Sequence, residues 1–184
     1  MDPYQIGVVV GSMRLDSLNR KLATAVARLA PKNFVFRHIR IDDLPLYNQD
    51  DDANPAPSVL RLKSDVLASQ GILFATPEYN RSIPGVLKNA LDHASRPYGK
   101  SVWAGKPAGV MGAAGGALGT ALAQQHLRNI LAYLDMPTLG QPEAFIQVKE
   151  GTFDAEGNIG PSSLAFLQTW MDRYVAWVTQ HSKS

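Results

Sequence analysis

The sequence predicts one α/β domain, a three-layer α/β/α sandwich built on a five-stranded parallel sheet. Short apolar runs alternate with amphipathic helical patterns in the order βαβαβαβαβα, and this alternation implies parallel strands joined by right-handed crossovers. Most of the runs are apolar throughout, as is typical of strands covered on both faces. The 184 residues are the size of a single domain, so we expect one folded unit over residues 1–184.

The elements are expected in a regular order along the chain. Apolar runs predict strands at residues 6–10, 35–41, 71–75, 107–111 and, more weakly, 144–148. Apolar periodicity predicts helices at residues 18–29, 59–67, 84–94, 118–134 and 162–178. We expect Ser17 to cap the first helix, the second helix to follow Ser58, and Pro84 to stand in the first turn of the third, where its missing N–H costs nothing. The buried face of the last helix is expected to carry Leu164, Leu167, Met171, Tyr174 and Val178.

The composition excludes several classes of protein. Lys plus Arg is 18 and Asp plus Glu is 16, and this surplus of two is too small to indicate a partner that is nucleic acid or an anionic membrane. The absence of cysteine excludes disulfides, thiolate catalysis, iron–sulfur clusters and cysteine zinc sites, and we expect no metal. Asp2 stands where a secretion signal carries positive charge, and the first apolar run is too short for one, so we expect a cytoplasmic protein.

Two stretches have unusual composition. Residues 107–127 carry no Asp, Glu, Lys or Arg, but they contain five Gly, one Pro, two Gln and one His. This mixture predicts a buried strand, a glycine loop and the start of a helix rather than a membrane span. Residues 42–58 are rich in Pro and Asp and predict a long surface loop, which is either functional or a solvated connector. Within it, residues 50–52 are expected to be a solvated acidic run.

Ligands of open α/β sheets bind beyond the carboxyl ends of the strands, so the turns after the first, third and fourth strands are the candidate site. The first turn, residues 11–19, has neither the GxGxxG nor the GxxxxGK[ST] spacing, but it offers Ser12, Arg14, Ser17 and Asn19 at the start of a helix. Hydroxyls, a guanidinium and free helix N–H groups are what a phosphate dianion requires. The alternative is a plain N-cap at Ser17 beside an exposed Arg14.

The other two turns suit a flat ligand. Residues 76–85 contain two prolines, which partly fix the backbone, and present Tyr79 for stacking and Asn80 for planar hydrogen bonding. Residues 112–119 are rich in glycine, which lets the backbone approach a ligand closely. The alternative for this last turn is a flexible loop.

These turns carry a family resemblance that covers residues 6 to about 160. The motifs are GSMRLDSLN, LPLYNQD, TPEYNRSIPGVLKNALDHASRP and AGKPAGVMGAAGGALGTALAQQHLRNIL. With them the chain resembles the NADPH-dependent FMN reductase family, in particular its quinone and chromate reductase branch. The resemblance implies a flavodoxin-like fold with strand order 2-1-3-4-5, and FMN as cofactor with NADPH or NADH as electron donor.

The resemblance also implies a role for particular residues. The FMN phosphate would be held by side chains and helix N–H groups of Ser12, Arg14, Ser17, Leu18 and Asn19. The isoalloxazine would be lined, largely through the main chain, by Pro77, Glu78, Tyr79 and Asn80. Its pyrimidine side would be contacted by Ala113, Ala114, Gly115 and Gly116.

Three departures from the family pattern affect substrate preference rather than flavin binding. The chain has His93 where members often carry Trp, Arg81 where they carry an aromatic or small residue, and Ala113 where some carry Ser. Arg81 either helps to hold the phosphate of NADPH or an anionic acceptor, or faces solvent. His93 lies on a helix, where a histidine is more often structural than catalytic.

The resemblance implies an enzyme in which NAD(P)H donates hydride to FMN and an acceptor then takes the electrons. The acceptor would be a quinone, or a chromate, azo or nitro compound. The cofactor performs the chemistry, so no residue is assigned as catalytic. The alternatives are a non-enzymatic electron carrier like flavodoxin, although flavodoxins are strongly acidic, and an FMN-free binding module.

The resemblance further implies a homodimer or homotetramer. The uncharged stretch and the last helix, which is apolar on more than one face, favour a buried surface between subunits. His126 and Arg128 would face either a partner subunit or water. Trp170 and Trp177 are expected in the core or in an interface rather than at the cofactor.

Overall fold

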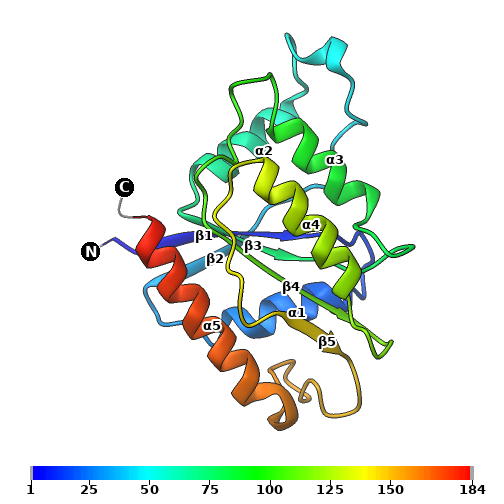
Figure 1. Ribbon diagram of the computed structural model, residues 1–184, viewed down its shortest axis with the longest axis vertical. Helices are drawn as coiled ribbons and strands as arrows, with labels where there is room; N and C mark the ends of the chain where they lie inside the picture. The colour runs from blue at the N-terminus through cyan, green and yellow to red at the C-terminus, as the bar shows by residue number, and fades with distance from the viewer. Residues whose placement is uncertain (1, 183–184) are drawn as a thin grey trace.

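The computed structural model describes residues 2–182 and contains one five-stranded sheet (Figure 1). Every pair of neighbouring strands is parallel, and the order is β2-β1-β3-β4-β5. This order confirms the predicted flavodoxin-like topology. The strands are β1 Tyr4–Val10, β2 Phe34–His38, β3 Gly71–Ala75, β4 Ala108–Ala114 and β5 Ala144–Gln147.

Five α-helices cover the two faces of the sheet and complete the three-layer sandwich. Helices α1 and α5 pack on one face, and α2, α3 and α4 pack on the other. The helices are α1 Leu18–Ala27, α2 Pro57–Leu67, α3 Gly85–Ala94, α4 Ala121–Tyr133 and α5 Pro161–His181, and a short 3-10 helix, η1 Gln49–Asp51, lies in the loop before α2. None of the helices in residues 2–182 is both long and apolar enough to cross a membrane.

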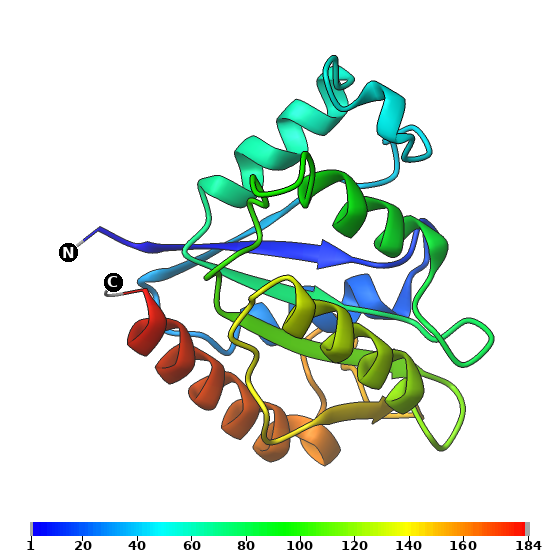
Figure 2. The same ribbon diagram turned by 45° about the horizontal axis from the view of Figure 1, so that its top comes forward.

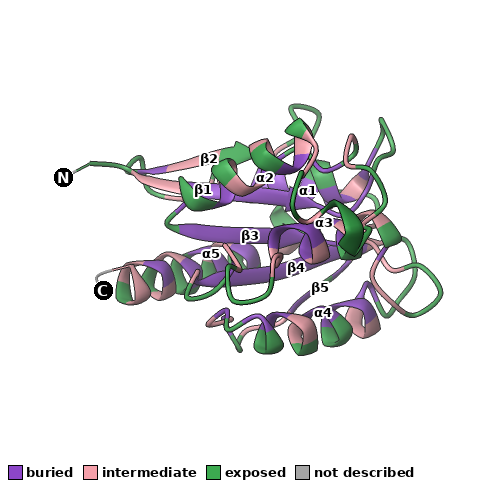
Figure 3. Ribbon diagram, turned by 90° about the horizontal axis from the view of Figure 1, so that it is seen from above, coloured by how far each residue is buried: buried purple, intermediate pink, exposed green. Residues whose placement is uncertain are grey.

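The apolar strands contribute side chains to two separate cores, because successive side chains of a strand point to opposite faces of the sheet. In β1, Val8 and Val10 pack with α1 and α5, whereas Val9 packs with α2 and α3. In β3, Leu73 faces the first core and Phe74 the second. Figure 3 shows the result, with buried strands enclosed between helices whose outer faces are exposed. The nearly continuous apolar runs in the sequence therefore indicated doubly covered strands correctly.

Several predicted boundaries differ from those in the structure. Strand β4 continues past Met111 to Ala114, because its last four residues pair with β5 and this pairing overrides the low strand preference of Gly and Ala. Strand β2 ends at His38 rather than at residue 41, although Ile39 and Ile41 remain buried. Helix α4 begins at Ala121, not at residue 118.

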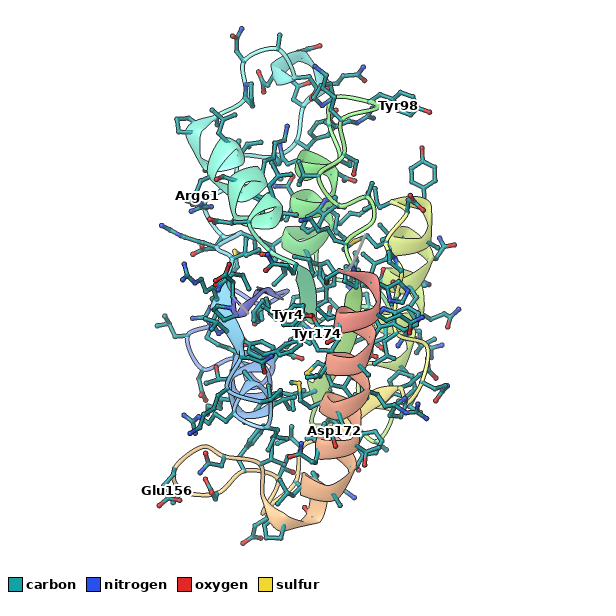
Figure 4. The ribbon with its side chains drawn as sticks, turned by 90° about the vertical axis from the view of Figure 1, so that its left-hand side faces the viewer. Tyr4, Arg61, Tyr98, Glu156, Asp172 and Tyr174 are labelled. Carbon is teal, nitrogen blue, oxygen red and sulfur yellow. The ribbon has the colours of Figure 1, made fainter. Side chains whose placement is uncertain are left out.

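Two smaller expectations about helices also fail. Helix α2 does not start after Ser58, because Pro57 already occupies the first helical position and Ala56 is the N-cap residue. On α5, Leu164 is 40% exposed, and Trp170 occupies the core in its place. Trp170 stacks on Tyr174 with ring centroids 5.4 Å apart, and both side chains are fully buried against the sheet (Figure 4 labels Tyr174).

Candidate functional site

The turns after β1, β3 and β4 lie at one edge of the sheet. These three strands are direct neighbours and parallel, so their carboxyl ends point the same way. Figure 2 shows the three turns side by side beyond the strand ends. The structure thus brings together the three segments that the sequence predicted as one site.

The turn after β1 presents free donors at the start of α1. Ser17 is the N-cap as predicted, and its hydroxyl accepts a hydrogen bond from the N–H of Arg20 at 3.2 Å. The Ser12 hydroxyl, which is buried, accepts one from the N–H of Arg14 at 3.4 Å. The first N–H groups of a helix lack intrahelical partners, so those of Leu18 and Asn19 remain available to an anion. The Arg14 side chain is exposed at the rim of this turn.

The side chain of Asn19 joins the first turn to the fourth strand. Its Nδ2 donates to the carbonyl of Ala113 at 2.9 Å, and its Oδ1 accepts from the Ala113 N–H at 2.8 Å. Asn19 and Ala113 are both buried, although they lie 94 residues apart in the chain. The oxygen and one N–H of the Asn19 side-chain amide are therefore bonded to protein, and its main-chain N–H remains available to a phosphate. The main-chain groups of Ala113 are occupied in the same way.

The carboxylate of Glu78 caps helix α4. Its Oε2 accepts hydrogen bonds from the N–H groups of Leu122 and Ala123, each at 3.0 Å. The residue at the N-cap position itself, Thr120, provides no side-chain cap. A carboxylate at this end also interacts favourably with the helix dipole. Glu78 thus fixes α4 to the turn after β3 through one of its two carboxylate oxygens.

Residues 79–82 form a tight hairpin above the sheet edge. The main chains of Tyr79 and Ser82 exchange two hydrogen bonds of 3.0 Å. The two residues between them, Asn80 and Arg81, have φ angles of 51° and 63°, the pattern of a type I′ turn. Positive φ is unusual for an arginine and costs energy. The turn holds Tyr79, Asn80 and Arg81 out toward solvent, where a ligand can reach them.

The glycine loop combines close packing with open space. A Cβ atom at Gly112 would collide with the Thr120 side chain and the Thr76 carbonyl, so only glycine fits between these turns. A Cβ at Gly115 or Gly116 would meet nothing within 4 Å. The exposed part of the loop is therefore a bare backbone that a flat ring can approach.

His93 has a structural role, as expected. Its Nε2 lies 2.9 Å from the carbonyl of Pro45 and donates to it, because a carbonyl only accepts. The amide of Asn89 donates to the same carbonyl at 2.8 Å and accepts from the N–H of Tyr47 at 2.8 Å. Helix α3 therefore anchors the long loop that carries the LPLYNQD motif.

The remaining residues of interest face their own chain or solvent. The guanidinium of Arg128 donates to the carbonyl of Leu139 at 2.7 Å and lies 3.6 Å from Glu143, so it contacts its own chain. Burial lowers the pKa of Arg128 and the charge of Glu143 partly offsets this. His126 is exposed and its Nδ1 lies 2.9 Å from the Ser82 hydroxyl, which ties α4 to the hairpin. The indole of Trp177 donates to a carbonyl in the loop after α4 at 2.9 Å.

Comparison with known proteins identifies the family. The NADPH-dependent FMN reductase model matches residues 4–150. The chain is 53% identical over 176 residues to a 2-hydroxy-1,4-benzoquinone reductase from Burkholderia sp, covering 95% of this chain and 96% of that protein. It is 44% identical to a quinone reductase from Pseudomonas putida, with 95% of both chains covered.

A solved structure agrees with these relatives. FerB from Paracoccus denitrificans, a flavoenzyme NAD(P)H:acceptor oxidoreductase, superposes with a TM-score of 0.92 at 44% identity, covering 97% of this chain and 98% of FerB. Fold and site define an oxidoreductase of the flavin-dependent class. The chain belongs to the NADPH-dependent FMN reductase family, whose members use FMN with NAD(P)H as donor.

Sequence reasoning missed two features of the site. It placed Asn19 and Glu78 beside the flavin but did not predict the protein contacts that their side chains make. Their partners lie 94 and 44 residues away, so no local spacing could have indicated these contacts. It also overlooked Arg20 and His38, which lie beside the first turn; the predicted order of β2 next to β1 was the available signal.

Proposed function

We propose that this protein is an FMN-dependent quinone reductase that transfers two electrons from NAD(P)H to a quinone. The observation that carries the proposal is the joined edge of the sheet. Asn19 binds the first turn to β4, and Glu78 binds the turn after β3 to α4. We call this joined set of three turns, residues 11–19, 76–82 and 112–119, the flavin cradle. The names of the relatives support a quinone as acceptor.

The residues of the cradle suit FMN. Its phosphate would lie against the N–H groups at the start of α1, with Arg14 supplying a charge-assisted contact. Its ring would lie against the exposed backbone of Gly115 and Gly116 and beside Tyr79. Bound FMN supplies hydride acceptance and two-electron transfer, and the protein supplies binding and orientation. The balanced reaction is NAD(P)H plus H⁺ plus quinone giving NAD(P)⁺ plus hydroquinone.

Two measurements test this proposal. Apo-protein is first titrated with FMN, and we expect the yellow spectrum of a bound flavin. NADPH and NADH oxidation by the holoenzyme is then followed with benzoquinone, chromate, an azo dye and a nitroaromatic compound, with quinone expected to be fastest. A protein that stays colourless would be an FMN-free binding module. A flavin-loaded protein without turnover would be an electron carrier.

We further propose that the protein assembles through α3 and α4 into a homodimer, or into a tetramer made of two such dimers. Tyr98 and Tyr133 are 85% and 82% exposed and line one concavity of about 740 Å³. Figure 4 shows Tyr98 projecting away from the body of the protein. Exposed apolar area of this kind usually marks an interaction site. Light scattering at micromolar concentration should report at least twice the mass of one chain, and the mass of one chain would contradict the proposal.

The use of NAD(P)H as electron donor also suggests where in the cell the protein acts. Because NAD(P)H is a cytosolic reductant, we propose the cytoplasm as the place of action. Fractionation of expressing cells, with activity recovered in the cytosolic fraction, checks this.

A further inference from the structure

A second pocket, of about 380 Å³, lies next to the flavin cradle on the side away from β3. Because β2 and β3 flank β1 on opposite sides, residues after β2 face a different part of the first turn than the flavin would. Ser12 and Met13 of that turn form one wall, residues 38–42 form the other, and Arg20 reaches in from α1. We call this the Arg20–His38 pocket.

The pocket carries positive charge without a matching anion. Within residues 2–182, Arg20 makes no side-chain ion pair or hydrogen bond. Partial burial lowers the pKa of His38, and the nearby charge of Arg20 lowers it further. Arg40 also lines the pocket, but its guanidinium is neutralised by Asp42 at 2.7 Å and approached by Asp43 at 3.7 Å. The charge of Arg20 thus disfavours protonation of His38, and an anion bound between the two would favour it.

The position of the pocket indicates which anion it accepts. It shares Ser12 with the cradle and so lies just beyond the expected place of the FMN phosphate. A dinucleotide donor is longer than FMN, so its far end extends past the flavin. In nucleotide-binding α/β folds, an acid near the end of the second strand binds the ribose 2′-hydroxyl of NAD, whereas an arginine accommodates the 2′-phosphate of NADP. Here the acid, Asp42, is already paired with Arg40, and the arginine, Arg20, is free.

We propose that the Arg20–His38 pocket binds the 2′-phosphate of NADPH and makes the enzyme prefer NADPH to NADH. This inference rests on the proposed function, because it concerns the donor of that reaction. NADPH and NADH differ only in this phosphate monoester, which would receive a planar, charge-assisted contact from Arg20 and a hydrogen bond from His38.

The kinetic test compares the two donors in the holoenzyme. Arg20→Gln should raise KM for NADPH about tenfold or more and leave KM for NADH unchanged, since a charge-assisted hydrogen bond changes affinity by at least that factor. His38→Gln should produce a smaller increase, again for NADPH alone. Arg37→Gln is the matched control, because it removes one exposed cation from β2 on the opposite face of the strand and should change neither KM. Equal KM values for NADPH in wild type and both pocket variants would overturn the proposal.

A binding test separates this inference from the proposed function. Adenosine 2′-monophosphate is titrated into the holoenzyme while the imidazole NMR signals of His38 are followed, with adenosine and inorganic phosphate as the other probes. We expect the nucleotide to shift the His38 signals in wild type and not in Arg20→Gln. If the nucleotide binds but the holoenzyme does not reduce quinone, the pocket assignment stands and the proposed quinone reductase activity is rejected. Equal binding of inorganic phosphate would reject the donor assignment, and loss of FMN from Arg20→Gln would assign Arg20 to the flavin instead.

Discussion

The flavin cradle and its cationic rim use their side chains in opposite ways. In the cradle, the side chains of Asn19 and Glu78 bind main-chain groups of distant segments, which leaves backbone N–H groups and bare glycines for the ligand. The cationic rim consists of Arg20, beside the first turn, and Arg81, on the hairpin of the cradle. Both residues are exposed and extend toward solvent. Long-range protein contacts therefore fix the shape of the cradle, whereas we propose that exposed charges bind the donor.

Asn19→Ala should produce the largest effect. It removes two buried hydrogen bonds and leaves the N–H and C=O of Ala113 without partners. Lost bonds and unsatisfied groups together should lower the free energy of unfolding by about 2–4 kcal/mol. For a chain of this length that lowers Tm by roughly 5–12 °C. Calorimetry of the apo-protein measures the change, and a Tm within about 1 °C of wild type would show that Asn19 does not hold the two segments together.

Arg14→Ala tests a charged side chain that we expect to contact the ligand rather than the protein. FMN affinity should fall about ten- to a hundredfold, because a charge-assisted contact to phosphate contributes roughly 1.5–3 kcal/mol. Arg14→Lys should restore only part of it, since lysine lacks the planar fork. Stability of the apo-protein should not change, because Arg14 is exposed. An unchanged FMN dissociation constant would remove Arg14 from the phosphate site.

Glu78→Ala should lower the free energy of unfolding by less than Asn19→Ala does. It removes the cap of α4, and loss of a cap costs about 0.5–2 kcal/mol. Glu78→Gln retains one acceptor oxygen and should lie between wild type and Ala. Urea denaturation of wild type, Glu78→Gln and Glu78→Ala measures the order of their stabilities. If Glu78→Ala were as stable as wild type, the cap would be energetically irrelevant and α4 would be held by packing alone.

Arg81→Ala should have the smallest effect and should differ from that of Arg20. An exposed cation on the hairpin would attract the diphosphate that both donors share, so KM should rise a few-fold for NADPH and NADH alike, with kcat little changed. The increase should shrink at high salt, because exposed charges are screened over roughly 8–10 Å. FMN content should stay constant. Identical KM values at both salt concentrations would leave Arg81 as a solvent-facing residue.

The same contrast explains what the sequence could predict. The five strands follow from apolar runs such as residues 71–75, where burial on both faces leaves a local signal. Their order was implied by the family resemblance and not by the runs themselves. The proximity of the three turns was also predicted, because parallel strands bring the turns after β1, β3 and β4 to one edge of the sheet. The hydrogen bonds of Asn19 to Ala113 were not predicted, because they join segments that only the folded sheet brings together. Likewise, pairing with β5 extended β4 through Ala114, against the local preference of its glycine and alanines.

The most direct test of the cradle is an NMR titration of ¹⁵N-labelled apo-protein with FMN. If the main chain holds the cofactor, the backbone amide signals of Leu18, Asn19, Gly115 and Gly116 should shift strongly. The side-chain amide signals of Asn19 should stay in place, because its Nδ2 remains bonded to Ala113. Large shifts of the Asn19 side-chain signals with unperturbed backbone amides would contradict the account, as would a protein that binds no FMN.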